Sequence, residues 1–388
     1  MQGITRRTLL GAGAALLTGR TALLNAQGRT CRVFVGTFTD PSGQNVPAYF
    51  EGNDPGTESR GLYTFLFDSA TGRAGDISLA AEVSNPFNLT VHTNKRMLYA
   101  CRWPTQIAEQ NLITAFVVEG NALRELNTVR SGGGGPTVGV VDRAGHYLLI
   151  TNFMTSSIAC FRLHRDGSLV SRSTLIDAKS TDGEPSGPHN IVLSMTERFA
   201  IVPEIFGNHC RVMRFDKNTG LLETHSLARD LNDAGPRHLV WHPSYRYLYT
   251  AGEMGSSISA WRWDENEGAL NVIQNLTTRP EGFTGRNTPA DIAMHPDGRF
   301  VYVTNRGAGT LAGFRIDQSN GSLTPVDQAN IGSPSSWSMV FDPSGHWALA
   351  AAQIGEEVVM YSVNQQSGRL TQTGQTLSVP SPTSLLCA

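Results

Sequence analysis

The stretch PADIAMHPDGRFVYVTNR, residues 289–306, contains two apolar segments joined by the sequence His-Pro-Asp-Gly. The segments have the pattern of short β-strands, and Pro-Asp-Gly is a turn signal, because glycine adopts positive φ without steric cost. The same order of initial proline or serine, strand, turn and strand begins again at Pro86, Pro136, Pro188, Pro236, Ser336 and Pro382. Successive copies start 46 to 53 residues apart, which indicates an internal repeat.

A second polar turn closes each repeat, as in Asp216–Gly220 and Asp317–Gly321. Each unit therefore holds about four short strands, and four strands per 40 to 50 residues are typical of a propeller blade. The copy from Pro382 is truncated, while the strands from Cys31 and Gly61 lack an innermost partner. We predict an all-β, seven-bladed β-propeller with four antiparallel strands per blade and a closing blade shared by the N- and C-termini. A pair of β-sandwiches is the alternative, but it does not require copies in register.

The N-terminus has the pattern of an export signal. Arg6 and Arg7 precede a short run of small and apolar residues, which Arg20 interrupts. Paired arginines before such a run are typical of twin-arginine signals, and the run is shorter than the roughly 20 apolar residues of a membrane span. We expect residues 1–26 to be the signal, read by the twin-arginine translocation machinery, and residues 27–388 to be one domain in a periplasmic or secreted protein. A cytosolic N-terminal extension is the alternative.

Composition excludes several kinds of function. The 388 residues carry a formal net charge of −2, so no basic field attracts nucleic acid. Lysine occurs only at positions 95, 179 and 217, which leaves little room for a Schiff-base or phosphate-loop lysine. His238 and His242 lie on one predicted strand and would be ~13 Å apart, too far to share a metal ion.

The five cysteines have neither a C-x-x-C pair nor a Cys/His cluster at zinc spacing. Their odd number and wide spacing argue against a disulfide framework. Cys31 and Cys387 would share the closing blade, and a disulfide between them stays open if their Cα atoms lie within ~7 Å.

The alternating direction of successive strands indicates which end of the propeller holds the candidate catalytic residues. The innermost strand of each blade begins, and the second strand ends, at the same face, close to the axis where the blades converge. Four ionisable side chains fall there at equivalent register positions, and we predict them as catalytic: His189, Arg237, Glu253 and Arg306. Arginine binds carboxylates and stabilises a developing oxyanion, while Glu and His exchange protons. Five neighbours by the same count are predicted to bind substrate: Asn152, Glu204, His238, Asn305 and Trp337. Ordinary solvated strand ends are the alternative.

The motifs GPHNIVLS, VPEIFGN, GPRHLVWHP, GEMGSSI and VTNRG, in this order and spacing, resemble the lactonase family of seven-bladed propellers. That family includes bacterial 6-phosphogluconolactonases and the fungal 3-carboxy-cis,cis-muconate cyclase. The resemblance runs from Val33 to the end of the chain. It implies a site built on the same histidine, two arginines and glutamate, with no metal and no cofactor. The sequence departs from the family at Ser336-Trp337, where relatives often have Pro-Arg, and after Arg306, where they often have His-Asp.

The resemblance implies a lactone hydrolase that is similar to 6-phosphogluconolactonase, and we predict that it acts on a sugar-acid lactone. We expect the protein to be a monomer. Arg237 and Arg306 would hold the substrate oxygens, Glu253 would act as general base, and His189 would relay a proton. Export favours an unphosphorylated lactone.

Two alternatives remain open. A lactonising cyclase would use the same residues, and Tyr302-Val-Thr-Asn305 resembles the YVTN propellers, which favours a non-catalytic exported binding protein. Two predicted insertions, residues 44–60 and 104–111, are expected to overhang the same face.

Overall fold

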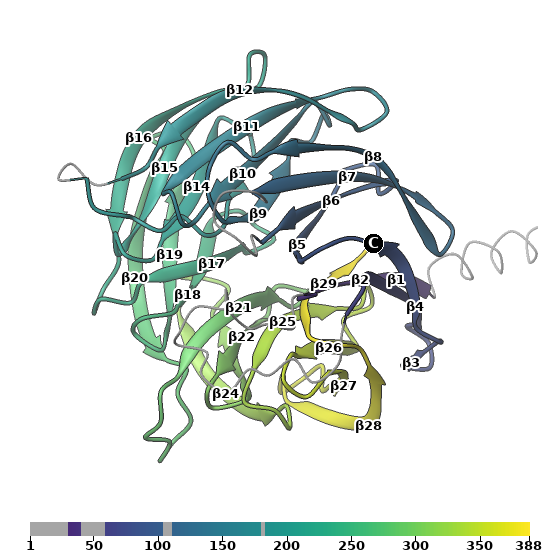
Figure 1. Cartoon of the computed structure of the whole chain (residues 1–388). Coiled ribbons are helices and arrows are strands. Elements are labelled where there is room, and N and C mark those ends of the chain that lie inside the picture. Colours follow the sequence, from purple (N-terminus) through teal and green to yellow (C-terminus); the bar gives the residue numbers. More distant parts are fainter. Residues whose placement is uncertain (1–29, 40–58, 104–110, 180–182) are drawn as a thin grey trace, which may run out of the picture.

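A computed structural model describes residues 30–39, 59–103, 111–179 and 183–388 of the chain (Figure 1). The predicted export signal lies outside these described residues. So do residues 44–58 of the first predicted insertion and 104–110 of the second. The described residues form β-strands and no helix, so none of them builds a helix of the length and hydropathy that crossing a bilayer requires.

The strands form seven sheets arranged around a central axis, as predicted (Figure 1). Six sheets each contain four strands that are consecutive in the chain: β5 to β8, β9 to β12, β13 to β16, β17 to β20, β21 to β24 and β25 to β28. Their bounds are β5 Pro86–Val91, β6 Met97–Arg102, β7 Leu112–Glu119, β8 Ala122–Arg130, β9 Pro136–Val141, β10 Tyr147–Asn152, β11 Ser157–Leu163, β12 Leu169–Asp177, β13 Val192–Leu193, β14 Phe199–Glu204, β15 His209–Asp216, β16 Leu221–Arg229, β17 Pro236–Trp241, β18 Tyr247–Gly252, β19 Ser257–Asp264, β20 Ala269–Thr277, β21 Thr288–Met294, β22 Phe300–Arg306, β23 Thr310–Ile316, β24 Leu323–Asn330, β25 Ser336–Phe341, β26 Trp347–Ala352, β27 Glu357–Val363 and β28 Leu370–Ser378.

The seventh sheet joins the two ends of the chain and confirms the predicted closing blade. The C-terminal strand β29 (Pro382–Cys387) is innermost and pairs antiparallel with β1 (Thr30–Thr37). Outside β1 follows β2 (Gly61–Asp68), which pairs with the short strands β3 (Arg73–Ala74) and β4 (Ser78–Glu82). The pairing of β29 with β1 closes the ring of blades, because it joins the C-terminal strand to the N-terminal sheet.

Cys31 and Cys387 lie in this closing blade as free thiols. Cys387 is directly opposite Val33, so Cys31 is its diagonal neighbour on the same face of the sheet. The two thiols share a hydrogen bond, which raises the pKa of Cys31 and lowers the pKa of Cys387.

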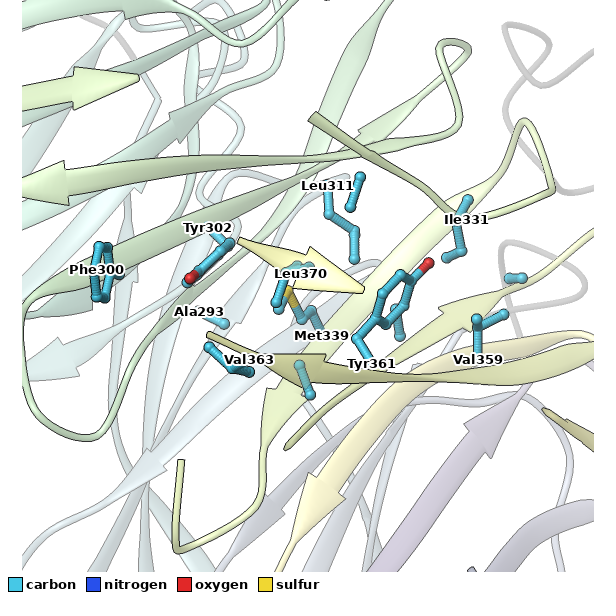
Figure 2. Packing of buried hydrophobic residues seen from close by; sticks show 14 residues of the cluster. Ala293, Phe300, Tyr302, Leu311, Ile331, Met339, Val359, Tyr361, Val363 and Leu370 are labelled. Carbon is cyan, nitrogen blue, oxygen red and sulfur yellow. The ribbon is translucent and has the colours of Figure 1, made fainter. Parts of the chain in front are cut away.

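The hydrophobic core is divided into clusters that lie between neighbouring blades. Figure 2 shows one of them, in which Phe300 and Tyr302 of one blade pack with Met339, Tyr361 and Leu370 of the next. In three blades, a tyrosine at the third position of the second strand forms a hydrogen bond to the next blade. Its hydroxyl donates to the carbonyl of the outer-turn glycine of the following blade, as in Tyr99 to Gly167, Tyr249 to Gly321 and Tyr302 to Gly368. Each of these three hydrogen bonds fixes one blade against the next.

Candidate active site

A β-bulge near the start of the innermost strands aims side chains at the axis. In β17 the register with β18 shifts between Pro236 and His238, so Arg237 is the extra residue. Strand β25 has the same irregularity around Trp337. Because a bulge bends its strand and re-aims the extra side chain, both residues leave the regular alternation of the sheet. The sequence pattern shows the repeat but not this displacement.

Three of the predicted catalytic residues form one buried ion-pair cluster. Glu253 directly follows β18, and Arg306 is the last residue of β22. Glu253 Oε2 lies 2.9 Å from Arg237 Nε, and Glu253 Oε1 lies 2.9 Å from Arg306 Nη2. No side chain of the three is more than 8% exposed. One carboxylate thus holds two guanidiniums, and the three groups together carry one excess positive charge, which suits an anion or a developing oxyanion.

Main-chain carbonyls also form hydrogen bonds with the same two guanidiniums. Arg306 Nε donates to the Thr288 carbonyl over 2.9 Å, and Arg237 Nη1 donates to the Ala290 carbonyl. Both acceptors belong to β21. The arginines of two different blades are therefore tied to one strand, which fixes the orientation of both guanidiniums.

The indole of Trp337 supports both arginines. The Cζ atom of Arg306 lies 4.8 Å from the ring centroid and that of Arg237 lies 5.8 Å from it. The ring is itself fixed, because Trp337 Nε1 donates to Ser335 Oγ over 2.8 Å. Trp337 was predicted to bind substrate, and the structure shows that it contacts the cluster that would bind it.

The fourth predicted catalytic residue, His189, packs against His238 with the two rings tilted by 52°. Their ring centroids are 5.1 Å apart, and both side chains are buried. Burial lowers the pKa of His189 well below its usual value, and the charges of Arg237 and Arg306 lower it further. The pKa of His238 is also lowered, first by burial and then by Arg237, although a hydrogen bond to Asp291 opposes this. Both imidazoles are therefore neutral at pH 7.

Aromatic side chains occupy the neighbouring part of the axial face. Phe38, Phe87 and Trp103 form a buried cluster with Trp337, and Phe153 packs against its edge. Phe87 lies 5.1 Å from Trp103 and 5.5 Å from Trp337 between ring centroids. The charged cluster therefore lies beside buried aromatic side chains. Because these side chains exclude water, the electrostatic interactions within the cluster are stronger.

The other predicted substrate-binding residues have partners within the sheets. Glu204, fully buried, accepts from Arg211 through both carboxylate oxygens and also pairs with His209 over 2.6 Å. Asn152 donates to Ser157 Oγ over 3.2 Å. Asn305 Nδ2 donates to the Thr278 carbonyl and to Thr310 Oγ1, and its Oδ1 accepts from Asn287. The structure brings together six of the predicted residues: His189, Arg237, His238, Glu253, Arg306 and Trp337. The catalytic and substrate-binding roles of these six, and of Asn152, Glu204 and Asn305, stay predictions.

Asp291, which lies inside β21, is not among the residues predicted from the sequence. Its Oδ1 atom is 2.9 Å from His238 Nδ1 in the neighbouring blade. Its one signal is that an acidic residue interrupts the apolar pattern of an innermost strand, Pro-Ala-Asp-Ile-Ala. Acidic residues seldom occur at such buried positions without a partner.

Comparison with known proteins agrees with the propeller fold. A family model described as "Lactonase, 7-bladed beta-propeller" matches residues 32–387. The chain belongs to this lactonase family. The match covers nearly all the described residues, so the family resemblance stated from the motifs is confirmed, together with its fold.

Relatives in the lactonase family carry related names. The chain is 28% identical to "6-phosphogluconolactonase" of Bacillus subtilis over 335 residues, which are 84% of this chain and 93% of the relative. It is 25% identical to "6-phosphogluconolactonase" of Formosa agariphila over 367 residues, covering 91% of this chain and 98% of the relative. These relatives support a lactone hydrolase.

Among solved structures, the "Periplasmic gluconolactonase, PpgL" of Pseudomonas aeruginosa has a TM-score of 0.81 at 23% identity. The superposition covers 92% of this chain and 99% of that chain. A structure from Lactobacillus plantarum has the same TM-score of 0.81 at 24% identity, covering 92% of this chain and 99% of that one. At this level of identity the likeness shows that the fold is shared along its length.

Proposed function

We propose that this protein hydrolyses a sugar-acid lactone at the axial cluster of Arg237, Glu253, Arg306, His189 and His238. The observation that carries the proposal is the Arg237–Glu253–Arg306 bridge, in which two buried guanidiniums converge at the axial face. The relatives named 6-phosphogluconolactonase support the same reaction class.

In this proposal the arginines act on the lactone carbonyl. Water adds to the carbonyl carbon, and charge develops on the carbonyl oxygen, where preorganised donors stabilise the transition state more than the substrate. Arg237 and Arg306 supply these donors, and their positions do not change during the reaction because Glu253 and Trp337 hold them. Collapse of the adduct breaks the ring C–O bond and releases a hydroxy acid.

The structure changes the role proposed for Glu253. Each of its oxygens is engaged with a guanidinium, so taking a proton from water would cost the carboxylate both ion pairs. We propose instead that Glu253 positions Arg237 and Arg306. The histidines are then the proton-transfer groups.

Hydrolysis of two lactones by the purified protein tests the proposal. Glucono-1,5-lactone and 6-phosphogluconolactone are compared by the acid that each releases, with and without a chelator. We expect turnover that the chelator does not change and that Arg237→Ala lowers by at least about 100-fold, the effect of removing one oxyanion donor. Arg246→Ala is the matched control, because Arg246 also stacks on an aromatic ring, that of Tyr247, but beside the turn at the opposite face.

Three results would contradict the proposal. If Arg237→Ala hydrolyses the lactone as fast as the wild type, the reaction does not take place at this cluster. Cyclisation of an unsaturated dicarboxylic acid without lactone hydrolysis identifies the lactonising cyclase. Binding of lactones without turnover identifies a binding propeller.

We also propose that the protein is exported and meets an unphosphorylated lactone. Arg6 and Arg7 support this, as does the description of the Pseudomonas aeruginosa structure as periplasmic. Fusion of residues 1–30 to a reporter that fluoresces after export in folded form tests it. Replacing Arg6 and Arg7 by lysine is expected to keep the reporter in the cytoplasm, whereas Arg20→Lys leaves its export unchanged. Export that does not depend on the arginine pair would contradict the twin-arginine route.

A further inference from the structure

The His238–Asp291 pair joins two blades directly beside the arginine cluster. His238 lies on β17 and Asp291 on β21, 53 residues further along the chain. The distance from His238 Nδ1 to Asp291 Oδ1 is 2.9 Å, and both side chains are largely buried. A buried carboxylate that orients an imidazole is the arrangement that enzymes use to prepare a histidine as a base.

Further hydrogen bonds fix the carboxylate of Asp291. Its Oδ1 atom also accepts from the Ile292 amide over 2.9 Å, and its Oδ2 atom accepts from Ser338 Oγ and the Met339 amide. Burial raises the pKa of Asp291, but the hydrogen bond and charge of His238 and the backbone amides outweigh it, so the pKa ends below its ordinary value. Asp291 is therefore an ionised acceptor with one orientation.

This acceptor sets the tautomer of His238. A carboxylate only accepts hydrogen bonds, so the proton of neutral His238 lies on Nδ1 and the lone pair lies on Nε2. Nε2 is buried and has no hydrogen-bond partner among the described residues. A buried polar atom without a partner costs free energy, and a role in binding or catalysis is one explanation for its presence.

The groups around His238 place this lone pair at the proposed reaction centre. Three charged groups act on its imidazole: Arg237 on its own strand, Arg306 from β22 and Asp291 from β21. The neutral ring of His189 packs against it. Glu253 bridges the two arginines. The imidazole is thus beside the guanidiniums assigned to the carbonyl oxygen.

We propose that His238, oriented through Nδ1 by Asp291, is the general base of the lactone hydrolysis, with Asp291 as its positioning residue. This inference rests on the proposed lactonase function and replaces Glu253 as the base. His238 Nε2 takes a proton from water as the water oxygen bonds to the lactone carbonyl carbon. When the adduct collapses, the ring C–O bond breaks and the imidazolium returns that proton to the ring oxygen. The net reaction is lactone plus water to hydroxy acid.

A second His–Asp pair in the same part of the chain provides a matched control. His295 and Asp297 lie 2.7 Å apart in the turn after β21, at the opposite face of the propeller. There the second ring nitrogen is used, because His295 Nε2 bonds to the Gly345 carbonyl over 2.8 Å. Both pairs join an imidazole Nδ1 to a carboxylate, but only the pair of His238 leaves Nε2 without a partner, at the axial face.

Comparison of Asp291→Asn with Asp297→Asn tests the inference. General-base catalysis is worth about 10²- to 10⁴-fold, so we expect Asp291→Asn to lower kcat by at least about 100-fold with a small change in KM. Asp297→Asn should change kcat less than threefold. Thermal unfolding of both variants verifies that they fold. A folded Asp291→Asn variant with kcat within threefold of the wild type would overturn the assignment, even where Arg237→Ala confirms the lactonase.

The pH profile distinguishes a base from a purely structural pair. Activity falls as pH drops through the pKa of the base, because protonation removes the lone pair. Asp291 raises the pKa of His238, so its replacement by Asn moves the acid limb of kcat to lower pH. An acid limb that keeps its position in Asp291→Asn contradicts the role of His238.

NMR of histidine-labelled protein tests the dyad without any lactone. At pH 7 the ¹⁵N shifts of His238 should show a protonated Nδ1 and an unprotonated Nε2, a state that Asp291→Asn removes. Protonated Nε2 in the wild type overturns the assignment. Failure of the wild type to hydrolyse any lactone, with the tautomer as expected, instead overturns the proposed function and with it the catalytic role.

Discussion

The guanidinium of Arg306 lies over the indole of Trp337, with its Cζ atom 4.8 Å from the ring centroid. The same ring lies 5.8 Å from Cζ of Arg237. One aromatic side chain therefore supports two cations from two other blades. Cation–π contacts of this kind contribute about 0.5–2 kcal/mol each when they are shielded from water. Trp337 thus organises the arginines of two other blades.

Trp337→Leu should therefore weaken substrate binding. Leucine keeps an apolar side chain but removes the π face, so both guanidiniums lose a fixed support. A loss of about 1.4 kcal/mol corresponds to a tenfold change, and we expect KM for the lactone to rise by roughly tenfold. Trp347→Leu is the control, because Trp347 packs on Phe67 at a distance from the cluster. An unchanged KM in Trp337→Leu would show that the arginines keep their positions without the indole.

Glu253→Gln should destabilise the fold as well as the site. The variant leaves two buried guanidiniums without their carboxylate, and removing one partner of a buried pair costs about 3–5 kcal/mol. Urea unfolding measures this loss. Glu119→Gln is the matched control, because the Glu119–Arg124 pair has a similar distance of 2.7 Å but side chains more than half exposed. Exposed pairs contribute about 0–1 kcal/mol, so equal losses in the two variants would contradict this account of the cluster.

Asp230 should make the stability depend on pH. Burial raises the pKa of this carboxyl to about 6, although hydrogen bonds from Ser259 and the Leu231 amide oppose the shift. The carboxyl ionises near its ordinary pKa of 3.8 in the unfolded chain, so ionisation penalises the folded state by about 3 kcal/mol at pH 7 and hardly at all below about pH 3. We expect the unfolding free energy of Asp230→Asn, relative to wild type, to increase by about 3 kcal/mol from about pH 3 to pH 7. A difference that is constant over this range would contradict the raised pKa.

Cys387 should be the most reactive cysteine of the native protein. It is partly exposed, and the hydrogen bond from Cys31 lowers its pKa. Burial raises the pKa of Cys101 and of Cys160 to about 12 and raises that of Cys210 well above its usual value. Because the thiolate is the nucleophile, iodoacetamide at pH 8 should label Cys387 first, as mass spectrometry of peptides will show.

The same experiment tests the disulfide between Cys31 and Cys387. Protein from an oxidising compartment that reacts at Cys387 only after treatment with a reductant would contain the bridge. Immediate labelling of Cys387 in such protein would exclude it, and first labelling at Cys101 or Cys160 would contradict the order of reactivity.

Repetition in the sequence was sufficient to predict the fold. The copies from Pro86 to Pro382 repeat the strand and turn signals at nearly constant spacing, and each of the six complete copies forms its own antiparallel sheet. Local turn chemistry and alternation of side chains determine such sheets, so they are readable from neighbouring residues. The incomplete first and last copies were sufficient to predict the closing blade, in which β29 pairs with β1.

The alternating direction of successive strands also predicted which residues reach the axial face, but it could not predict what each contacts. Glu204 is the last residue of β14 and Glu253 the first residue after β18. Because successive side chains of a strand point to opposite sides, this single step leaves Glu204 bound by Arg211 inside its own blade and brings Glu253 between two arginines.

The amino-acid sequence by itself determined the repeat, the seven-bladed ring and the set of ionisable residues at one end of its axis. Only the tertiary structure decided that Glu253 is held by two arginines, that Trp337 lies beneath both, and that Asp291 orients His238. These contacts join side chains from different blades, so their geometry depends on bulges in individual strands and on the angle at which neighbouring sheets pack. No sequence pattern within one repeat predicts the bulges or the packing angle, because both depend on how the blades pack when the ring closes.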